Sequence, residues 1–177
     1  VDDTTMADIL AGQARSTTHL PLPGSDRQRY WDILTRAFDL YLKLGDEAKA
    51  VELAKETVPY ASLKGIVDVT ARALRLVAPG SEDAGWLSAR HGVALLDEHG
   101  DFPGAHAAEE HAFSIGEKLG NLSLKARALA HLAQVASAED DHKVAVSRGI
   151  AAIAAARAAG DPSSEIRVPA FAARSML

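Results

Sequence analysis

The chain has 177 residues, a formal net charge of −5 and no cysteine. The absence of cysteine excludes disulfides, thiolate metal ligands and a cysteine nucleophile, and it fits a reducing cytosol. Lys and Arg are scattered, so the basic stripe that duplex DNA binding requires is missing, as are a signal peptide and any apolar run of the roughly 18 residues that span a membrane. We therefore expect a cytoplasmic segment that contacts neither nucleic acid nor membrane.

Hydrophobic residues make up 47% of the chain, many of them alanine, whereas aromatic residues make up only 5%. Such a core requires helices that pack closely around small side chains. Val, Ile, Thr and Tyr form none of the alternating runs typical of β-strands. The composition therefore predicts an all-α chain, with about 8–9 helices by apolar periodicity.

Three segments repeat one pattern of helix, turn and small residue. The two tryptophans each precede a Gly-Asp pair by fourteen residues, and the pattern recurs at an offset of 55 and then of 40. Its first four positions step 3, 4 and 3, which places them on one stripe of an α-helix. The three copies are Trp31, Leu34, Phe38, Tyr41, Gly45, Asp46 and Ala50; Trp86, Ala89, Val93, Leu96, Gly100, Asp101 and Ala105; and Ala126, Leu129, Ala133, Ala136, Asp140, Asp141 and Ala145.

A helix–turn–helix unit repeated at this spacing predicts an α-solenoid of antiparallel helix pairs, a right-handed superhelix of the tetratricopeptide-like kind. Trp31 and Trp86 are expected at equivalent buried positions between paired helices. Ala50, Ala105 and Ala145 are expected where those helices approach closely. An irregular helical bundle is the alternative, but a bundle has no reason to repeat these residues in register.

The N-terminal part is predicted to contain a short helix, Thr5–Ala14, followed by a proline-containing loop. The first strong helix is predicted over residues 26–44, with Ser25 as its N-cap and Gln28 completing a capping box. Gly45 ends this helix, because glycine adopts the left-handed C-cap conformation at little steric cost.

Two helices are predicted before the second tryptophan. The first covers residues 47–57, with Asp46 as its cap and Pro59 as its end, since proline lacks the amide proton. The second covers residues 62–78, carries apolar residues at helical spacing and is closed by Pro79-Gly80. This extra helix explains why the two offsets differ.

The remaining helices are predicted from regular punctuation. Ser81 caps a helix over residues 82–99, and further helices cover residues 102–119, 122–138 and 142–159. The helix over residues 102–119 is expected to bury an apolar stripe that consists of Phe102, Ala105, Ala108, Ala112, Ile115 and Leu119.

The predicted organisation has three parts. Residues 1–24 precede the array; residues 25–162 form the repeats, at about 26–57, 62–119 and 122–159; and residues 163–177 form a truncated or capping helix, although Pro169 conflicts with a helix interior. The chain begins with Val1 and stops inside this last helix, so we expect a piece of a longer protein. Self-association is expected through the unfinished ends, around Ile9 and Leu10 and over residues 166–177.

Residues 72–81, 87–101 and 105–121 resemble part of the tetratricopeptide-like array in large bacterial ATP-binding regulators of the LuxR class and in related cyclase-linked ATPases. The resemblance covers roughly residues 25–165 and lies in helix lengths and punctuation. It implies that the repeats receive an inducer or a regulatory protein, while a nucleotide-binding module and often a DNA reader lie elsewhere in the parent chain. One departure is that Gly-Asn or Gly-Asp replaces the proline that usually closes a consensus repeat.

No catalytic residue, metal ligand or cofactor is assigned. The sequence lacks a Gly-x-x-x-x-Gly-Lys phosphate loop and a Gly-x-Ser-x-Gly nucleophile elbow. His106 and Glu110 share a helix face, but His111 is displaced by about 100° from Glu110, so a solvated helix face is favoured over a metal site. The acidic cluster 139–142 lacks the spacing of a calcium loop and is interpreted as a turn in which Asp141 caps a helix.

A candidate binding groove follows from helix geometry. In arrays of this kind the first helix of each pair lines the concave side, where positions beside the core stripe project. An ordinary solvated surface is the alternative. The candidate groove residues are Thr35, Asp39, Arg90, Asp97, Arg127, His131 and Gln134, with Ala94 and Ala130 between them.

The predicted function is a non-enzymatic interaction or sensor segment of a multidomain bacterial transcriptional regulator. Its partner would be a protein, a peptide or an adjacent domain of the parent chain, bound along the concave side. The alternative is a helical domain that binds a small-molecule effector and controls a linked ATPase. An enzyme is the third and least favoured hypothesis, because no convergent set of titratable residues is evident.

Overall fold

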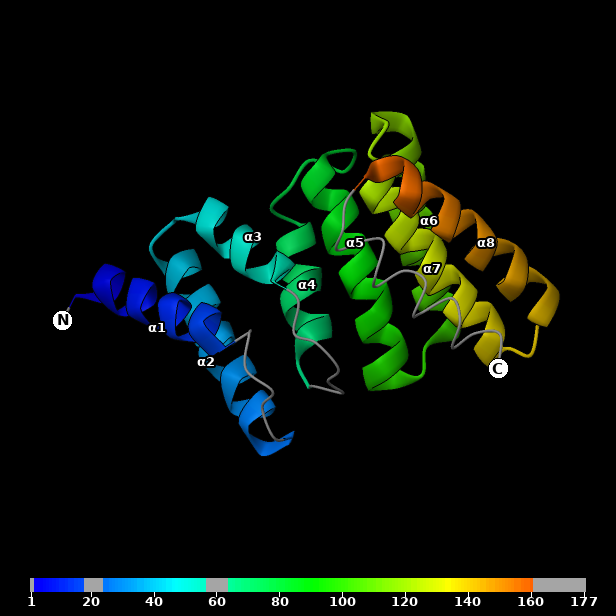
Figure 1. The fold of residues 1–177 in the computed structure, drawn as a ribbon. Helices are drawn as coiled ribbons and strands as arrows, with labels where there is room; N and C mark the ends of the chain where they lie inside the picture. The colour runs from blue at the N-terminus through cyan, green and yellow to red at the C-terminus, as the bar shows by residue number, and fades with distance from the viewer. Residues whose placement is uncertain (1, 18–23, 57–63, 161–177) are drawn as a thin grey trace. The chain divides into compact units, whose positions relative to one another are not determined.

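The computed structural model describes residues 2–17, 24–56 and 64–160, and within them the chain is all-α, with eight α-helices and no strand (Figure 1). This confirms the all-α prediction, whereas the solenoid of antiparallel helix pairs and its right-handed superhelix remain predictions. The chain divides into two compact units, Val1–Val77 and Ala78–Leu177. None of the helices in the described ranges combines the length and apolar character needed to cross a membrane.

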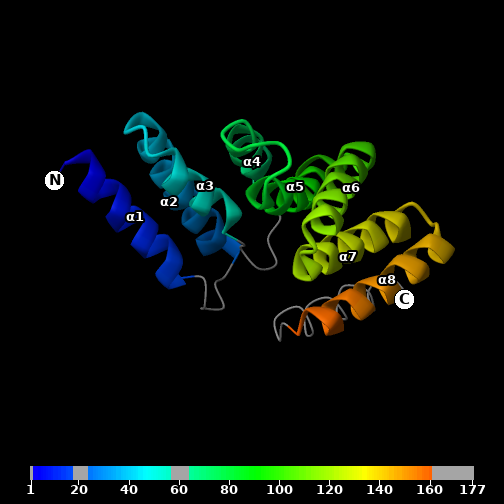
Figure 2. The same ribbon diagram turned by 90° about the horizontal axis from the view of Figure 1, so that it is seen from above.

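The first unit contains α1 (Asp3–Thr17), α2 (Gly24–Lys43), α3 (Glu47–Lys55) and α4 (Ile66–Leu74), and each helix packs against the next in the chain (Figure 2). The α4 helix is the extra helix that the unequal offsets predicted. The core of the unit includes the predicted stripe of α2, whose four members are all buried: Trp31, Leu34, Phe38 and Tyr41.

The polar face of helix α1 is hydrogen-bonded to α2 and α3. The carboxylate of Asp8 accepts hydrogen bonds from Tyr41 Oη at 2.6 Å and from Lys49 Nζ at 3.0 Å, and these contacts lower the pKa of Asp8. Leu10 is buried, whereas Ile9 is 46% exposed. Helix α2 thus covers one face of α1. The predicted unfinished segment 166–177 lies outside the described residues.

The second unit contains α5 (Glu82–Ala94), a π-helical turn η1 (Leu95–His99), α6 (Phe102–Leu119), α7 (Leu122–Ala138) and α8 (His142–Ala159). Each helix packs against the next, and the ribbons of α5 to α8 follow one another in both views (Figures 1 and 2). The predicted bounds of the last three helices are confirmed to the residue.

The turns between helices repeat one backbone geometry. Gly45, Gly100 and Asp140 have φ of 74°, 61° and 61°, in the left-handed region that ends a helix. The aspartate after each of them accepts a hydrogen bond from the amide three residues later, at 3.1, 2.9 and 3.1 Å. Gly120 and Asn121 form a fourth such turn, with a 2.9 Å cap bond. The predicted caps at Asp46, Ser81 and Asp141, the last of them in the acidic cluster, are confirmed.

The second copy of the repeat departs from the first at the π-helical turn. The amide of Asp101 bonds to Leu95 O, six residues back, whereas the amide of Asp46 bonds to Tyr41 O, five residues back. A π turn takes in an extra residue and so rotates the helix face. The last stripe position of this copy, Leu96, is accordingly only half-buried.

The predicted equivalence of the two tryptophans is only partly correct. Trp31 is 1% exposed, but Trp86 is half-buried, so the prediction of equal burial was wrong. The small-residue prediction is confirmed, because Ala50, Ala105 and Ala145 are all fully buried.

Three other local predictions need correction. Helix α2 begins at Gly24, so Ser25 lies inside it and not at its N-cap, and the side-chain amide of Gln28 bonds to the backbone of Lys64. Helix α4 covers only Ile66–Leu74 and is therefore shorter than the predicted helix over residues 62–78. The predicted buried stripe of α6 is only partly buried. Leu119, the last residue of the helix, is 48% exposed, and Phe102 and Ala108 are half-buried.

Candidate functional site

The predicted groove residues fall into two groups, each within one unit. Thr35 and Asp39 belong to α2 in the first unit. The other five belong to the second unit, on α5, η1 and α7: Arg90, Asp97, Arg127, His131 and Gln134.

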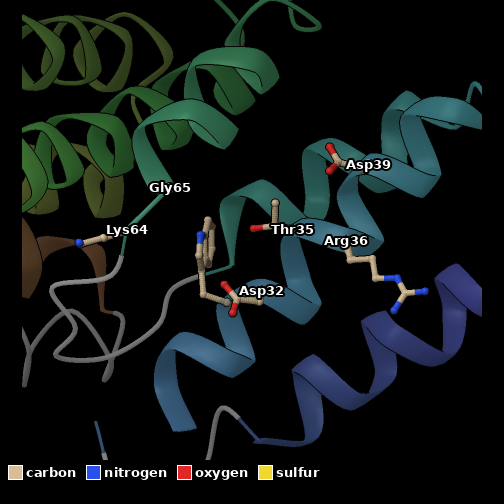
Figure 3. Close-up of a pocket in the computed structure, with 7 residues that line it drawn as sticks. Asp32, Thr35, Arg36, Asp39, Lys64 and Gly65 are labelled. Carbon is tan, nitrogen blue, oxygen red and sulfur yellow. The ribbon is translucent and has the colours of Figure 1, made fainter. Parts of the chain in front are cut away.

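The first group borders a hollow of about 330 Å³ on the surface of the first unit (Figure 3). Five of its seven lining residues are exposed, so the hollow is open to solvent. Its charged side chains do not converge, since Arg36 and Lys64 point away from each other in Figure 3. The lining residues are Trp31, Asp32, Thr35, Arg36, Asp39, Lys64 and Gly65.

The surroundings of two predicted residues, Asp39 and Thr35, limit which polar groups of this hollow are available to a ligand. Asp39 accepts a 2.7 Å hydrogen bond from Arg72 Nη2, so its charge is already paired. The Thr35 hydroxyl oxygen is buried and has no hydrogen-bond partner among the described residues.

The edge of the hollow at Gly65 depends on glycine. Gly65 has φ of 95°, and a Cβ atom there would lie 3.4 Å from Trp31 Nε1. The preceding residue is held to α2 by Gln28, which accepts from Lys64 N at 3.2 Å and donates to Lys64 O at 3.4 Å. The side of the hollow opposite α2 is therefore fixed by main-chain contacts.

The second unit contains a buried ionisable pair. Glu109 of α6 is 0% exposed, and its Oε1 lies 2.9 Å from Nδ1 of His131, which is 6% exposed. Burial raises the pKa of Glu109, while His131 and Arg127 oppose that rise by favouring the ionised carboxylate. The other oxygen, Glu109 Oε2, is buried and has no hydrogen-bond partner among the described residues.

Glu109 lies where α5, α6 and α7 meet. A Cβ atom on Gly92 of α5 would come within 2.8 Å of Glu109 Cγ and Oε1 and within 3.1 Å of the Ala105 carbonyl oxygen. Glycine therefore leaves the space that the Glu109 side chain occupies. His131 closes the other side from α7.

Glu109 was not predicted as a site residue, because the charged residues in this part of α6 are typical of a solvated helix face. A usable signal was present. Glu109 is four residues after Ala105 and three before Ala112, both on the buried stripe, so helical periodicity places it in the core.

In the same unit, Arg127 of α7 lies over the ring of the half-buried Trp86 of α5. The guanidinium carbon is 5.8 Å from the ring centroid, a cation–π geometry. Trp86 Nε1 donates to Glu82 Oε1 at 3.3 Å, and Asn121 Nδ2 donates to the same oxygen at 2.7 Å. Arg127 thus contacts an accessible aromatic ring and also acts electrostatically on Glu109.

The remaining groove residues differ in accessibility. Asp97 on η1 is exposed and Gln134 is half-buried, so both can contact a partner. Arg90 is 7% exposed, and like His131 it can contact a partner only if neighbouring helices move. Helix geometry alone did not predict which of these residues a neighbouring helix covers.

The histidines of α6 face different neighbours. Glu110 Oε1 accepts from Arg148 Nη2 at 2.7 Å, and His106 Nε2 lies 3.4 Å from Arg148 Nη1, so both face α8. His111 Nδ1 instead lies 3.0 Å from Ser88 Oγ on α5. Among the described residues no three His, Cys, Asp or Glu side chains are grouped as metal ligands would be. The sequence matches no protein-family model and no curated protein.

Proposed function

We propose that this chain is a non-enzymatic interaction segment whose helical hairpins present a surface to a protein or peptide. The observation that carries the proposal is the repeated hairpin turn, in which a left-handed residue and an Asp or Asn cap join helices that each pack on the next. Repeat units of this kind expose one helix of each pair along a continuous face, which suits extended partners.

The geometry of the hollow favours a peptide over a small molecule. Its volume of about 330 Å³ is at the lower end of the range for small-molecule sites. Such sites are mostly apolar and enclose their ligand, however, whereas five of the seven residues around this hollow are exposed and four are charged. A small-molecule effector is therefore the second candidate.

The proposal extends to the kind of parent protein. The resemblance of helix lengths and punctuation to the arrays of bacterial LuxR-class regulators supports a role as the sensor segment of such a regulator. The partner would then be a regulatory protein or a neighbouring domain, and its binding would favour one arrangement of the helices over another.

A selection experiment tests the interaction role. A random twelve-residue peptide library is panned on the purified chain, and enriched peptides are synthesised and titrated by fluorescence anisotropy. Thr35→Arg fills the hollow and Arg127→Gln removes the cation beside Trp86. Ser114→Arg and Lys143→Gln are controls at exposed positions on α6 and α8.

We expect at least one peptide to lose about tenfold in affinity with Thr35→Arg or Arg127→Gln, equivalent to one buried contact of about 1.4 kcal/mol, and to bind the controls like the parent. Failure to enrich any peptide, or equal binding to all variants, would contradict the proposal.

A further inference from the structure

The exposed side of α8 is apolar, which is uncommon for a helix at the surface. Residues 149–156 are all glycine, alanine or isoleucine, so every side of α8 is apolar in this stretch. Ile150 is 60% exposed, and Val146 and Ala154, one turn before it and one turn after it, are exposed as well. A helix that is apolar all round is ordinarily covered on more than one side. The stripe of these three residues, here called the outer face of α8, therefore has the character of a packing surface.

Helix α7 shows how a helix of this composition is covered within the second unit. It is also rich in alanine, it packs against both α6 and α8, and ten of its 17 residues are buried. Helix α8 buries only five of its 18 residues. Within residues 64–160, α7 is the only helix against which α8 packs extensively. Helix α8 thus has the composition of α7 with one covering neighbour instead of two.

The residues that follow α8 match those at the earlier junctions between helices. Gly160 has φ of 60°, close to the 61° of Gly100 and the 67° of Gly120. An Asp or Asn after each of the two earlier glycines caps the next helix, and that helix packs back on the one before it. Asp161 occupies the same position after Gly160, and Pro162 follows it, where proline is favoured in the first turn of a helix. The signal that reverses the chain elsewhere is therefore present after α8.

The hairpin of α6 and α7 shows which residues meet across such a turn. Glu117 and Lys125, which are joined at 2.7 Å, lie three residues before the Gly-Asn turn and four after it. Glu109 and His131, which are 2.9 Å apart, lie eleven residues before the turn and ten after it. Residues at nearly equal distances from the turn thus face each other.

We propose that residues 161–177 of the same chain cover the outer face of α8, in the register of the α6–α7 hairpin. Ile150 is then paired with Phe171, each ten residues from the Gly-Asp turn. Ile153 is paired with Val168, each seven residues from it. Large apolar side chains thus meet at both positions. The outer face of α8 is in this case covered within the chain and is not a docking surface for a partner.

A charged pair agrees with the same register. Arg157 and Glu165 lie three residues before the Gly-Asp turn and four after it, the positions that Glu117 and Lys125 occupy around the Gly-Asn turn. The signs of the two charges are exchanged, so the pair is again attractive. Apolar and charged positions on both sides of the turn therefore favour one pairing.

A second copy of the chain fits the outer face less well. Two α8 helices that meet antiparallel about Ile150 would place Lys143 of each copy beside Arg157 of the other, because each lies seven residues from Ile150. Like charges at close distance repel. The charges on α8 thus favour residues 161–177 over the self-association that the sequence suggested.

Disulfide formation tests the pairing, since the chain has no cysteine of its own. One double variant combines Ile153→Cys with Val168→Cys, and a second combines Ile150→Cys with Phe171→Cys. Both are needed because Pro169, which lies between the two pairs, ends or bends a helix. Each should form an intramolecular bond on mild oxidation, because a disulfide requires Cβ atoms about 4 Å apart. Trypsin cuts at two arginines between the cysteines, so linked peptides identify the bond by mass spectrometry.

The matched control combines Val144→Cys with Val168→Cys. Val144 is 37% exposed on the same helix but lies nine residues before Ile153, on the opposite side of α8. The test pairs should bond at least about tenfold faster than the control, more than the effect of loop length alone. Circular dichroism confirms that the helices persist.

Three outcomes would overturn the proposal. They are the absence of a bond in both test pairs, bonding of the control as fast as the test pairs, and disulfide-linked dimers on a non-reducing gel. No partner is present in this experiment, so its outcome is independent of the proposed interaction role.

Discussion

Glu109 Oε1 and His131 Nδ1 lie 2.9 Å apart across the interface of α6 and α7, in a part of the core that water does not reach. The same two helices are also joined by a solvent-accessible ion pair between Lys125 and Glu117 at 2.7 Å, whereas the contact of Glu109 with His131 is buried. It ties the stability of the second unit to pH.

The first prediction concerns Glu109→Gln. The folded-state pKa of Glu109 is raised above 4.5, so the folded chain holds this proton more tightly than the unfolded chain. The stabilisation from that proton is fully present below pH 4.5 and is lost as the pH rises through the folded-state pKa. The free energy of unfolding of the parent should therefore fall relative to that of the variant over this interval. Urea titrations at a series of pH values measure it; parallel curves would show that Glu109 does not titrate as described.

The second prediction concerns close packing at the repeated alanine. Ala105 is fully buried and its carbonyl oxygen faces Gly92 of α5. Ala105→Leu should lower the free energy of unfolding by about 1–3 kcal/mol through overpacking. Ala107→Leu is the matched control, because Ala107 is exposed on the same helix and leucine has nearly the helix propensity of alanine. Equal urea midpoints for the two variants would rule out close packing at Ala105.

The third prediction concerns the turn before α8. Asp140 has φ of 61°, a left-handed conformation that glycine occupies at the equivalent positions Gly45 and Gly100. Asp140→Gly should stabilise the chain by about 1 kcal/mol, because it removes the Cβ clash of a left-handed residue. Glu139→Gly, at φ of −92°, should instead destabilise it by about 0.5–1 kcal/mol. The midpoints of thermal unfolding of both variants measure these changes in stability. A lower midpoint for Asp140→Gly than for the parent would contradict the prediction.

The fourth prediction concerns nucleotide. Since the sequence has no phosphate-binding loop, calorimetry should give no saturable heat with ATP, and no phosphate should be released. Stoichiometric ATP binding that a single substitution abolishes would contradict the non-enzymatic interpretation.

The sequence predicted helix bounds best where capping residues at the two ends of a helix determine them. The bounds of α6, α7 and α8 followed from a left-handed Gly or Asp and the Asp or Asn cap after it, which act within a few residues. It predicted less well at α2 and α4, where Gln28 reaches the backbone of Lys64, a contact that no local pattern encodes.

The site was harder to predict, for two physical reasons. Trp86 has the same spacing to its Gly-Asp pair as Trp31 and yet is half-buried, because the repeat pattern does not encode how far the neighbouring helices cover each ring. Glu109 was missed because a charged residue is ordinarily exposed, although its place on the stripe with Ala105 and Ala112 pointed inward.

The most direct test of the interaction role is the affinity of a library-selected peptide for the parent, for Thr35→Arg and Arg127→Gln, and for the controls Ser114→Arg and Lys143→Gln. We expect about a tenfold rise in Kd for one of the first two variants and none for the controls. Peptides that bind all five proteins alike, or no selectable peptide at all, would contradict it.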